Sequence, residues 1–358
     1  MDIAIVGLPA SGKTTLFRAL TAGHGSTSGD SRGEHLGTVK IPDERLERLA
    51  ALVSAKKVTP LEVRLHDLPP LFIRGAAPSG EAADTLGKAD ALLHVVRAFQ
   101  RDDVPHPAGS VNPERDVAAF DAELMLSDLA IIERRLEKLD TQVRSGRPGE
   151  REAGEREQAL LLRCKQKLES DRPLREAITD AQDARGLLNF GLLSLKPMLL
   201  VINVDESDAG RGSAIEAEWQ EQRQIAAVAA LCARLEAELA ELSPEDGAEF
   251  RKELGAEEGG PERLLGKLME LLHLITFFTA GEKETRAWTV SAGGSALQAA
   301  GRIHTDIERG FIRAEVISWE KLLERGSHAE ARKHGELRTE GKTYVVQDGD
   351  VVNVLFNV

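Results

Sequence analysis

Short apolar runs recur along the chain and are separated by amphipathic stretches. Residues 3–6, 89–97 and 196–203 are almost continuously apolar, which predicts strands buried on both faces of a parallel sheet. Residues 61–66 alternate between apolar and polar side chains, as a strand with one buried face does, and residues 225–231 predict a further strand. Strands that alternate with helical patterns favour an α/β fold.

A different apolar period extends from about residue 113 to residue 168. Apolar residues recur there at alternating steps of three and four among charged residues, at Leu129, Ile132, Leu136 and Leu139. This spacing predicts a coiled-coil seam on a long helix. Residues 145–150 break the pattern, and Leu161, Cys164 and Leu168 continue the seam. We therefore expect an antiparallel helical hairpin, which is either a solvated spacer or an arm that reaches a partner.

The last part of the chain has a third pattern. Strand-like segments at residues 274–281, 286–290, 342–346 and 351–356 surround one helical pattern near residues 296–304, which favours a small β-grasp module. We therefore predict one α/β domain that is formed by two separate segments, residues 1–112 and 196–272, and that includes an amphipathic helix at 42–52. Residues 113–195 are the arm inserted between these segments. Residues 273–358 are the β-grasp module.

The first apolar run leads into a candidate phosphate-binding loop. Its sequence, with the spacing G-x-x-x-x-G-K-T, is Gly7-Leu8-Pro9-Ala10-Ser11-Gly12-Lys13-Thr14-Thr15. Gly7 and Gly12 permit a tight curl that points N–H groups at a phosphate, and the following helix adds the positive end of its dipole. We expect Lys13 to reach the β- and γ-phosphates and to support catalysis, and Thr14 to bind Mg²⁺. The competing interpretation is a glycine turn with a chance Lys-Thr pair.

Two segments downstream match the switches of GTPase-like proteins only in part. Asp67 ends the strand predicted at 61–66 and is the second candidate for a Mg²⁺ contact, although a capping role for a loop carboxylate competes. The fourth residue of such a switch is normally a glycine whose N–H contacts the γ-phosphate, but Pro70 has no N–H. In the first switch, Thr27 and Thr38 are the candidates for a Mg²⁺-binding threonine. His106 lies in a polar loop expected near the phosphates, where a lone histidine is more often simply solvated.

The nucleotide base is expected to lie beside Asn203, Val204 and Glu206. These residues occupy the position of the N-K-x-D motif, whose aspartate accepts hydrogen bonds from guanine. Glu206 carries one more methylene than aspartate, so we expect weaker discrimination in favour of guanine, and both ATP and GTP are candidate ligands. Cys232 and Ala233 follow the next strand, where a backbone N–H is predicted to meet the base edge.

Composition excludes several other functions. No apolar run approaches the roughly 20 residues that span a bilayer, and the first strand begins at once, so we expect neither membrane association nor a signal peptide. A net charge of −13 argues against binding of free nucleic acid through charge alone, and we expect no sequence-specific DNA binding. Cys164 and Cys232 lack disulfide or metal spacing, which favours reduced thiols in a cytoplasmic protein.

Several motifs in a fixed order resemble one known family, the Obg-like ATPases (YchF). The resemblance runs nearly from end to end and includes the phosphate loop and residues 94–97, 203–206 and 232–238. Its most specific part is the C-terminal series Phe278-Thr279-Ala280-Gly281, Arg286-Ala287-Trp288-Thr289-Val290, Ile303-His304-Thr305-Asp306, residues 310–316 and Val346-Gln347-Asp348-Gly349-Asp350.

The resemblance implies a Ras-like P-loop domain with an inserted coiled-coil arm and a C-terminal ubiquitin-like TGS domain. It implies slow Mg²⁺-dependent hydrolysis of ATP, often in preference to GTP, and association with ribosomes or ribosomal RNA through the arm and the TGS domain. It also implies that Leu71 stands where other GTPases carry a water-orienting glutamine, and that His106 takes over that role.

The chain departs from this family at the second switch. That switch reads Asp67-Leu68-Pro69-Pro70, and residues 71–87 keep little of the family's Gly-rich pattern beyond Arg74-Gly75-Ala76. These changes affect γ-phosphate sensing and hydrolysis more than nucleotide binding. A slow hydrolase is therefore our first hypothesis and a hydrolysis-deficient nucleotide-binding scaffold the second. A small-molecule kinase is third, because residues 23–37 offer only Arg32 for a phosphate-binding lid.

Overall fold

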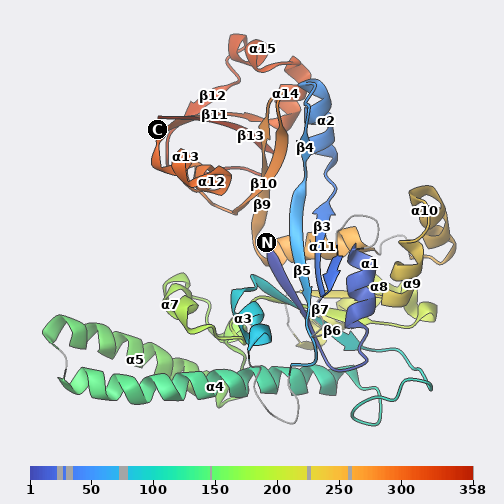
Figure 1. Cartoon of the computed structure of the whole chain (residues 1–358), viewed down its shortest axis with the longest axis vertical. Coiled ribbons are helices and arrows are strands. Elements are labelled where there is room, and N and C mark those ends of the chain that lie inside the picture. The colour runs from blue at the N-terminus through green and yellow to red at the C-terminus, as the bar shows by residue number, and fades with distance from the viewer. Residues whose placement is uncertain are drawn as a thin grey trace. The chain divides into compact units, whose positions relative to one another are not determined.

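The computed structural model describes residues 1–21, 27–29, 35–71, 80–145, 147–223, 227–256 and 260–357. The chain divides into two compact units (Figure 1). The first comprises Met1–Thr38 and Arg64–Pro261, and the second Val39–Val63 and Glu262–Val358.

The first unit is built on a seven-stranded sheet with the order β2-β3-β5-β1-β6-β7-β8. The strands are β1 Asp2–Val6, β2 Thr27–Gly29, β3 His35–Ile41, β5 Leu61–Asp67, β6 Ala91–Arg97, β7 Met198–Asn203 and β8 Val228–Leu231. Strands β5 and β6 flank β1 on opposite sides, and both run parallel to it. The loops after β1 and β6 therefore leave the same edge of the sheet side by side, where α/β proteins bind ligands.

Strands β6 and β7 are buried along their whole length, as their continuous apolar sequences predict. The helices of this unit include α1 Lys13–Thr21, α3 Glu81–Lys88, α8 Gly212–Arg223, α9 Ala233–Leu239 and α10 Pro244–Glu253, whereas α11 Pro261–Leu271 belongs to the second unit except for its first residue. One apolar cluster joins Val6 and Leu92 to Leu86 of α3, and another joins Ile202 to residues of α8 and α9.

Two long helices, α4 (Pro113–Ser145) and α5 (Pro148–Leu168), form where the 3–4 spacing predicts them. They lie side by side and run in opposite directions (Figure 1). Their shared core contains Ile132, Leu139, Leu161, Cys164 and Leu168, and short helices α6 (Leu174–Ala177), α7 (Ala181–Leu187) and η1 (Leu188–Phe190) follow. At the base, the fully buried Asp128 accepts hydrogen bonds from Leu193 N, Ser194 N and Ser194 Oγ, which fixes α4 to the returning chain.

The second unit contains a six-stranded sheet with the order β12-β11-β13-β9-β10-β4. Its strands are β4 Val58–Thr59, β9 Leu274–Ala280, β10 Thr285–Ser291, β11 Phe311–Ser318, β12 Arg338–Glu340 and β13 Asp350–Phe356. Its helices are α2 Glu44–Leu52, α12 Ala296–Ile303, α13 Thr305–Arg309, α14 Trp319–Arg325 and α15 His328–Lys333.

This unit differs from the sequence prediction in several ways. Strands β11 and β12 were not predicted, and residues 262–272, predicted in the α/β domain, fall in this unit. Helix α2 was predicted within residues 1–112 of the α/β domain, but Leu46 and Leu49 pack with Phe278 and Ile317, so α2 belongs to the C-terminal unit. The predicted strand at 342–346 is also absent from the described structure, where only one bridge, between Val345 and Ser295, occurs. Amphipathicity identifies a helix that must be buried, but not the core that buries it.

In the described part of the chain, no helix is both long and apolar enough to cross a membrane.

Candidate phosphate and nucleotide site

The segment between β1 and α1 has the backbone of a phosphate-binding loop. Gly7, Ala10 and Gly12 have positive φ angles of 143°, 61° and 97°. A Cβ on Gly7 would lie 2.3 Å from Val95 O, and one on Gly12 would lie 2.1 Å from Asn203 Nδ2. Both positions therefore require glycine for conformation and for space, as predicted. Pro9 and Ala10 are exposed at the turn, whereas Ser11 is buried and Thr15 half-buried.

Lys13 folds back over this loop. Its Nζ donates hydrogen bonds to Gly7 O and Leu8 O, each at 3.0 Å, and the residue is only 8% exposed. Burial lowers the pKa of Lys13, while the charge of Asp67 opposes that shift. An ammonium held in low dielectric gains strongly from an added anion, so the loop is electrostatically prepared for a phosphate.

Thr14 and Asp67, the two residues predicted to contact Mg²⁺, lie side by side. Thr14 Oγ1 donates a 2.7 Å hydrogen bond to Asp67 Oδ2. Asp67 is 2% exposed, and its Oδ1 has no hydrogen-bond partner among the described residues. Burial raises the pKa of Asp67, partly offset by the Thr14 hydrogen bond and the Lys13 charge. Mg²⁺ takes oxygen ligands and retains several waters, so a hydroxyl beside a buried carboxylate with a free oxygen fits this ion.

Asn203 connects the phosphate loop to the base side of the site. Its Nδ2 donates to Ser11 O and its Oδ1 accepts from Ala233 N, both at 2.9 Å. The Ala233 N–H, predicted to meet the base edge, is therefore already used by Asn203. The Val204 side chain is also directed away from the site, because it is 4% exposed and belongs to an apolar cluster with Trp219 and other core residues.

Glu206 and Cys232 complete the predicted base site and differ in exposure. Glu206 is exposed at the start of the 3₁₀ helix η2 (Glu206–Arg211), whereas Cys232 is 5% exposed and precedes α9. Burial raises the pKa of the Cys232 thiol, which is therefore not a nucleophile at neutral pH. Of the residues predicted to lie beside the base, Glu206 is therefore the one with an exposed side chain.

The second switch enters the core directly after Asp67. Leu68 and Leu71 are 1% and 9% exposed and pack with Leu86, while Pro70 is exposed. The other predicted switch elements lie largely outside the described residues: these are residues 72–79, including Arg74-Gly75-Ala76, and the Thr27 side chain. Thr38 is described and lies in β3.

His106 is not the solvated loop histidine that composition favours. Its ring is 4% exposed, and Nε2 lies 2.9 Å from Oδ2 of Asp116, in the first turn of α4. The buried Arg97 at the end of β6 organises the loop that carries His106, through bonds to Phe99 O, Arg101 O and Val104 O. The contacts that Asp116 and Arg97 make with this loop were not predicted. No local pattern distinguishes Asp116 from any other acidic residue in the first turn of a helix.

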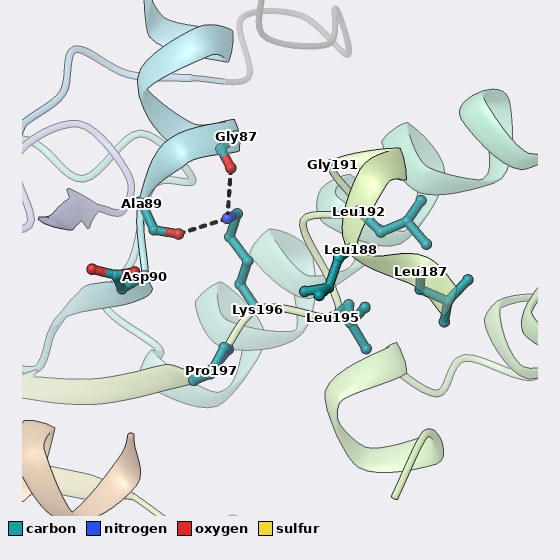
Figure 2. Close-up of a pocket in the computed structure, with 10 residues that line it drawn as sticks. All are labelled: Gly87, Ala89, Asp90, Leu187, Leu188, Gly191, Leu192, Leu195, Lys196 and Pro197. Carbon is teal, nitrogen blue, oxygen red and sulfur yellow. Dashed lines mark hydrogen bonds between the residues drawn. The ribbon is translucent and has the colours of Figure 1, made fainter. Parts of the chain in front are cut away.

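A separate cavity of about 300 Å³ lies in the first unit between the end of α3 and the chain before β7 (Figure 2). Four leucines line it, at positions 187, 188, 192 and 195, beside Lys196 and Asp90. The Lys196 ammonium already donates to Gly87 O at 3.0 Å and to Ala89 O at 2.6 Å, which closes the C-terminal end of α3. The cavity shares no residue with the phosphate loop, and its lysine has a structural role.

Comparisons with known proteins identify the family of the chain. A family model described as "50S ribosome-binding GTPase" matches residues 2–127, and the C-terminal model of YchF GTPases, described as a protein of unknown function, matches residues 274–357. The chain is 38% identical to the "Ribosome-binding ATPase YchF" of Escherichia coli O157:H7, covering 99% of this chain and 98% of that protein. The Bacillus subtilis protein of the same name is also 38% identical, with full coverage of both.

A solved structure, the Schizosaccharomyces pombe YchF GTPase, has a TM-score of 0.84 at 29% identity, covering 99% of this chain and 97% of that one. Sequence and structure thus match over the whole chain, including both units and the phosphate loop. The chain belongs to the YchF family of P-loop proteins.

Proposed function

We propose that the protein is a slow, Mg²⁺-dependent hydrolase of ATP or GTP that works on ribosomes. The observation that carries this proposal is the arrangement at the end of β1. There, a curled loop, the buried ammonium of Lys13 and the Thr14–Asp67 pair lie together. These are the groups that phosphoryl transfer requires for positioning and charge neutralisation.

Each group has a distinct task in hydrolysis. The loop N–H groups and Lys13 bind the phosphates and stabilise the negative charge that develops on them. Thr14 and Asp67 would hold Mg²⁺, which would supply positive charge to neutralise the phosphates. His106 orients the attacking water, a role assigned from the family resemblance. Pro70 withholds the N–H that would contact the γ-phosphate, which explains a slow rate: one missing preorganised donor costs about 3 kcal/mol.

The base side supports tolerance of both purines. Asn203 directs both polar atoms of its amide to protein groups, so it orders the loop rather than reading the base. Glu206 is exposed and longer than the aspartate that binds guanine. We therefore propose binding of ATP as well as GTP, with the preference set by the base-side loops.

The remaining parts are proposed to serve ribosome contact. The α4–α5 hairpin is proposed to be a coiled-coil arm, and the C-terminal unit a TGS domain, together reaching the ribosome or its RNA. The name of the relatives, ribosome-binding ATPase, supports this assignment. It also supports a cytoplasmic location.

Phosphate release from Mg·ATP and Mg·GTP, measured with and without ribosomes, tests the proposal. Lys13→Ala should lower kcat by about 100-fold, since it removes a charged donor from the transition state. Arg18→Ala, at an exposed position on the same helix, is the matched control. Wild-type turnover no faster than that of Lys13→Ala, with both nucleotides and with ribosomes present, would refute hydrolysis.

One observation favours a second function, a nucleotide-binding scaffold without turnover. Pro70 removes a γ-phosphate contact, yet Lys13, Thr14 and Asn203 retain their binding geometry. This function predicts micromolar affinity by calorimetry with no phosphate release. Failure to bind either nucleotide would contradict both proposals.

A further inference from the structure

The loop between β6 and α4, residues 98–112, is fixed at both ends. At the β6 end, Arg97 is 2% exposed and donates from Nε to Phe99 O at 3.2 Å and from Nη2 to Val104 O at 3.0 Å. A guanidinium that bonds several carbonyls of one loop fixes the course of that loop. The loop leaves the sheet beside β1, so its residues lie next to the phosphate loop in the topology of the fold.

Both nitrogens of the His106 ring lie close to polar groups of this loop and of α4. Residues 106–109 form a turn in which Gly109 N donates to His106 O at 2.9 Å, and Ala108 N donates to His106 Nδ1 at 3.1 Å. Because Nδ1 is an acceptor, the ring proton lies on Nε2. That nitrogen lies 2.9 Å from Asp116 Oδ2, and the two side chains are 4% and 5% exposed.

Asp116 is held rigidly on the first turn of α4. Asn112 caps this helix through its Oδ1, which accepts from Arg115 N at 2.9 Å. The Arg115 side chain donates to Asp116 Oδ1 from Nε at 3.1 Å and from Nη2 at 2.8 Å. Asp116 Oδ2, in contrast, has no bond of hydrogen-bond geometry within the described residues, because the His106 contact meets the distance but not the direction. The contact is therefore close but poorly directed, and weaker than a well-aligned hydrogen bond.

A ring in this position does not act on water at a phosphate. Its two nitrogens face the backbone of its own turn and a carboxylate of α4, and almost none of its surface is open. A residue that orients the attacking water must place one nitrogen within about 3 Å of that water. For His106 to do so, its contact with Asp116 has to end.

We propose that Asp116 is a positioning residue that stores His106 on α4, away from the phosphates, and so limits basal hydrolysis. This inference rests on the proposed function, since it needs His106 as the water-orienting group. Hydrolysis then requires the His106 side chain to move away from Asp116 and toward the nucleotide. Because Asp116 belongs to the first turn of α4, any partner that displaces this turn also frees the histidine.

The test is steady-state hydrolysis of Mg·ATP by the full chain carrying Asp116→Ala. We expect kcat to rise a few-fold, less than the roughly tenfold that one hydrogen bond of ordinary net strength would give, with KM unchanged. Asp103→Ala removes an exposed carboxylate from the same loop and is the matched control, with wild-type rates expected. In a His106→Ala background, Asp116→Ala should change nothing, which a merely structural role would not predict.

A second readout follows the loop itself. Trypsin should cut after the exposed Arg101 faster in Asp116→Ala than in wild type, because His106 no longer fastens the loop to α4. Should Asp116→Ala fail to fold, Asp116→Asn replaces it, with a smaller rise in kcat and in cleavage expected.

Three results would overturn the inference: an unchanged or lower kcat in folded Asp116→Ala, an equal gain in the His106→Ala background, or unchanged cleavage after Arg101. The proposed role of His106 fails separately if His106→Ala alone leaves wild-type hydrolysis intact. Hydrolysis as a whole fails if turnover does not depend on Lys13.

Discussion

His94 makes the stability of the first unit depend on pH. It lies on β6, is 1% exposed, and its ring stacks on Phe120 of α4 with centroids 4.2 Å apart. Its Nδ1 has no hydrogen-bond partner among the described residues. Burial, with smaller contributions from the charges of Arg175 and Lys13, lowers the pKa of His94 from 6.5 to about 3. The folded protein therefore holds this imidazole neutral.

The sign and size of the effect follow from that pKa difference. As pH falls below 6.5, the unfolded chain binds a proton at His94 while the folded chain does not, so the free energy of unfolding decreases. Each unit of pH between the two pKa values is worth about 1.4 kcal/mol. Acidification to about pH 5 should therefore remove about 2 kcal/mol, and the loss should continue until about pH 3.

Urea unfolding near pH 7.5 and pH 5 measures this loss, followed by the fluorescence of Trp219, the tryptophan of the first unit. His94→Gln removes the titrating group, so its stability should fall on acidification by about 2 kcal/mol less than that of wild type. His334→Gln, which removes an exposed imidazole, is the control. Equal losses in wild type and His94→Gln would refute the reasoning.

Three further predictions concern the nucleotide site. Gly12→Ala should abolish nucleotide binding in calorimetry, because its Cβ would lie 2.1 Å from Asn203 Nδ2 at a φ of 97°, whereas Ala10→Gly should bind normally. Asn203→Ala should weaken binding by about tenfold, since the loop loses its tie to β7; wild-type affinity would contradict that role. Asp67→Asn should raise the Mg²⁺ concentration that nucleotide binding needs. It should also remove the pH dependence of the Mg²⁺-dependent affinity. In wild type, burial raises the pKa of Asp67, so Mg²⁺-dependent affinity should fall on acidification before pH reaches the ordinary value of 3.8, and an unchanged profile in the variant would exclude Asp67 as the ligand.

The sequence by itself determined the features that depend on local patterns. The phosphate loop could be predicted because its glycines, Lys13 and Thr14 act within one turn between a strand and a helix. Continuous apolar runs predicted β6 and β7, and the 3–4 spacing predicted α4 and α5. Each of these signals depends on neighbours a few residues away, so the chain carries it without tertiary information.

Only the tertiary structure decided where those elements find their partners. It placed α2 in the C-terminal core, engaged the Ala233 N–H with Asn203, and buried His106 against Asp116. In each case the deciding contact joins residues that the local pattern does not link. A polar group must find a partner once it is buried, and which partner it finds depends on the packing of the whole fold.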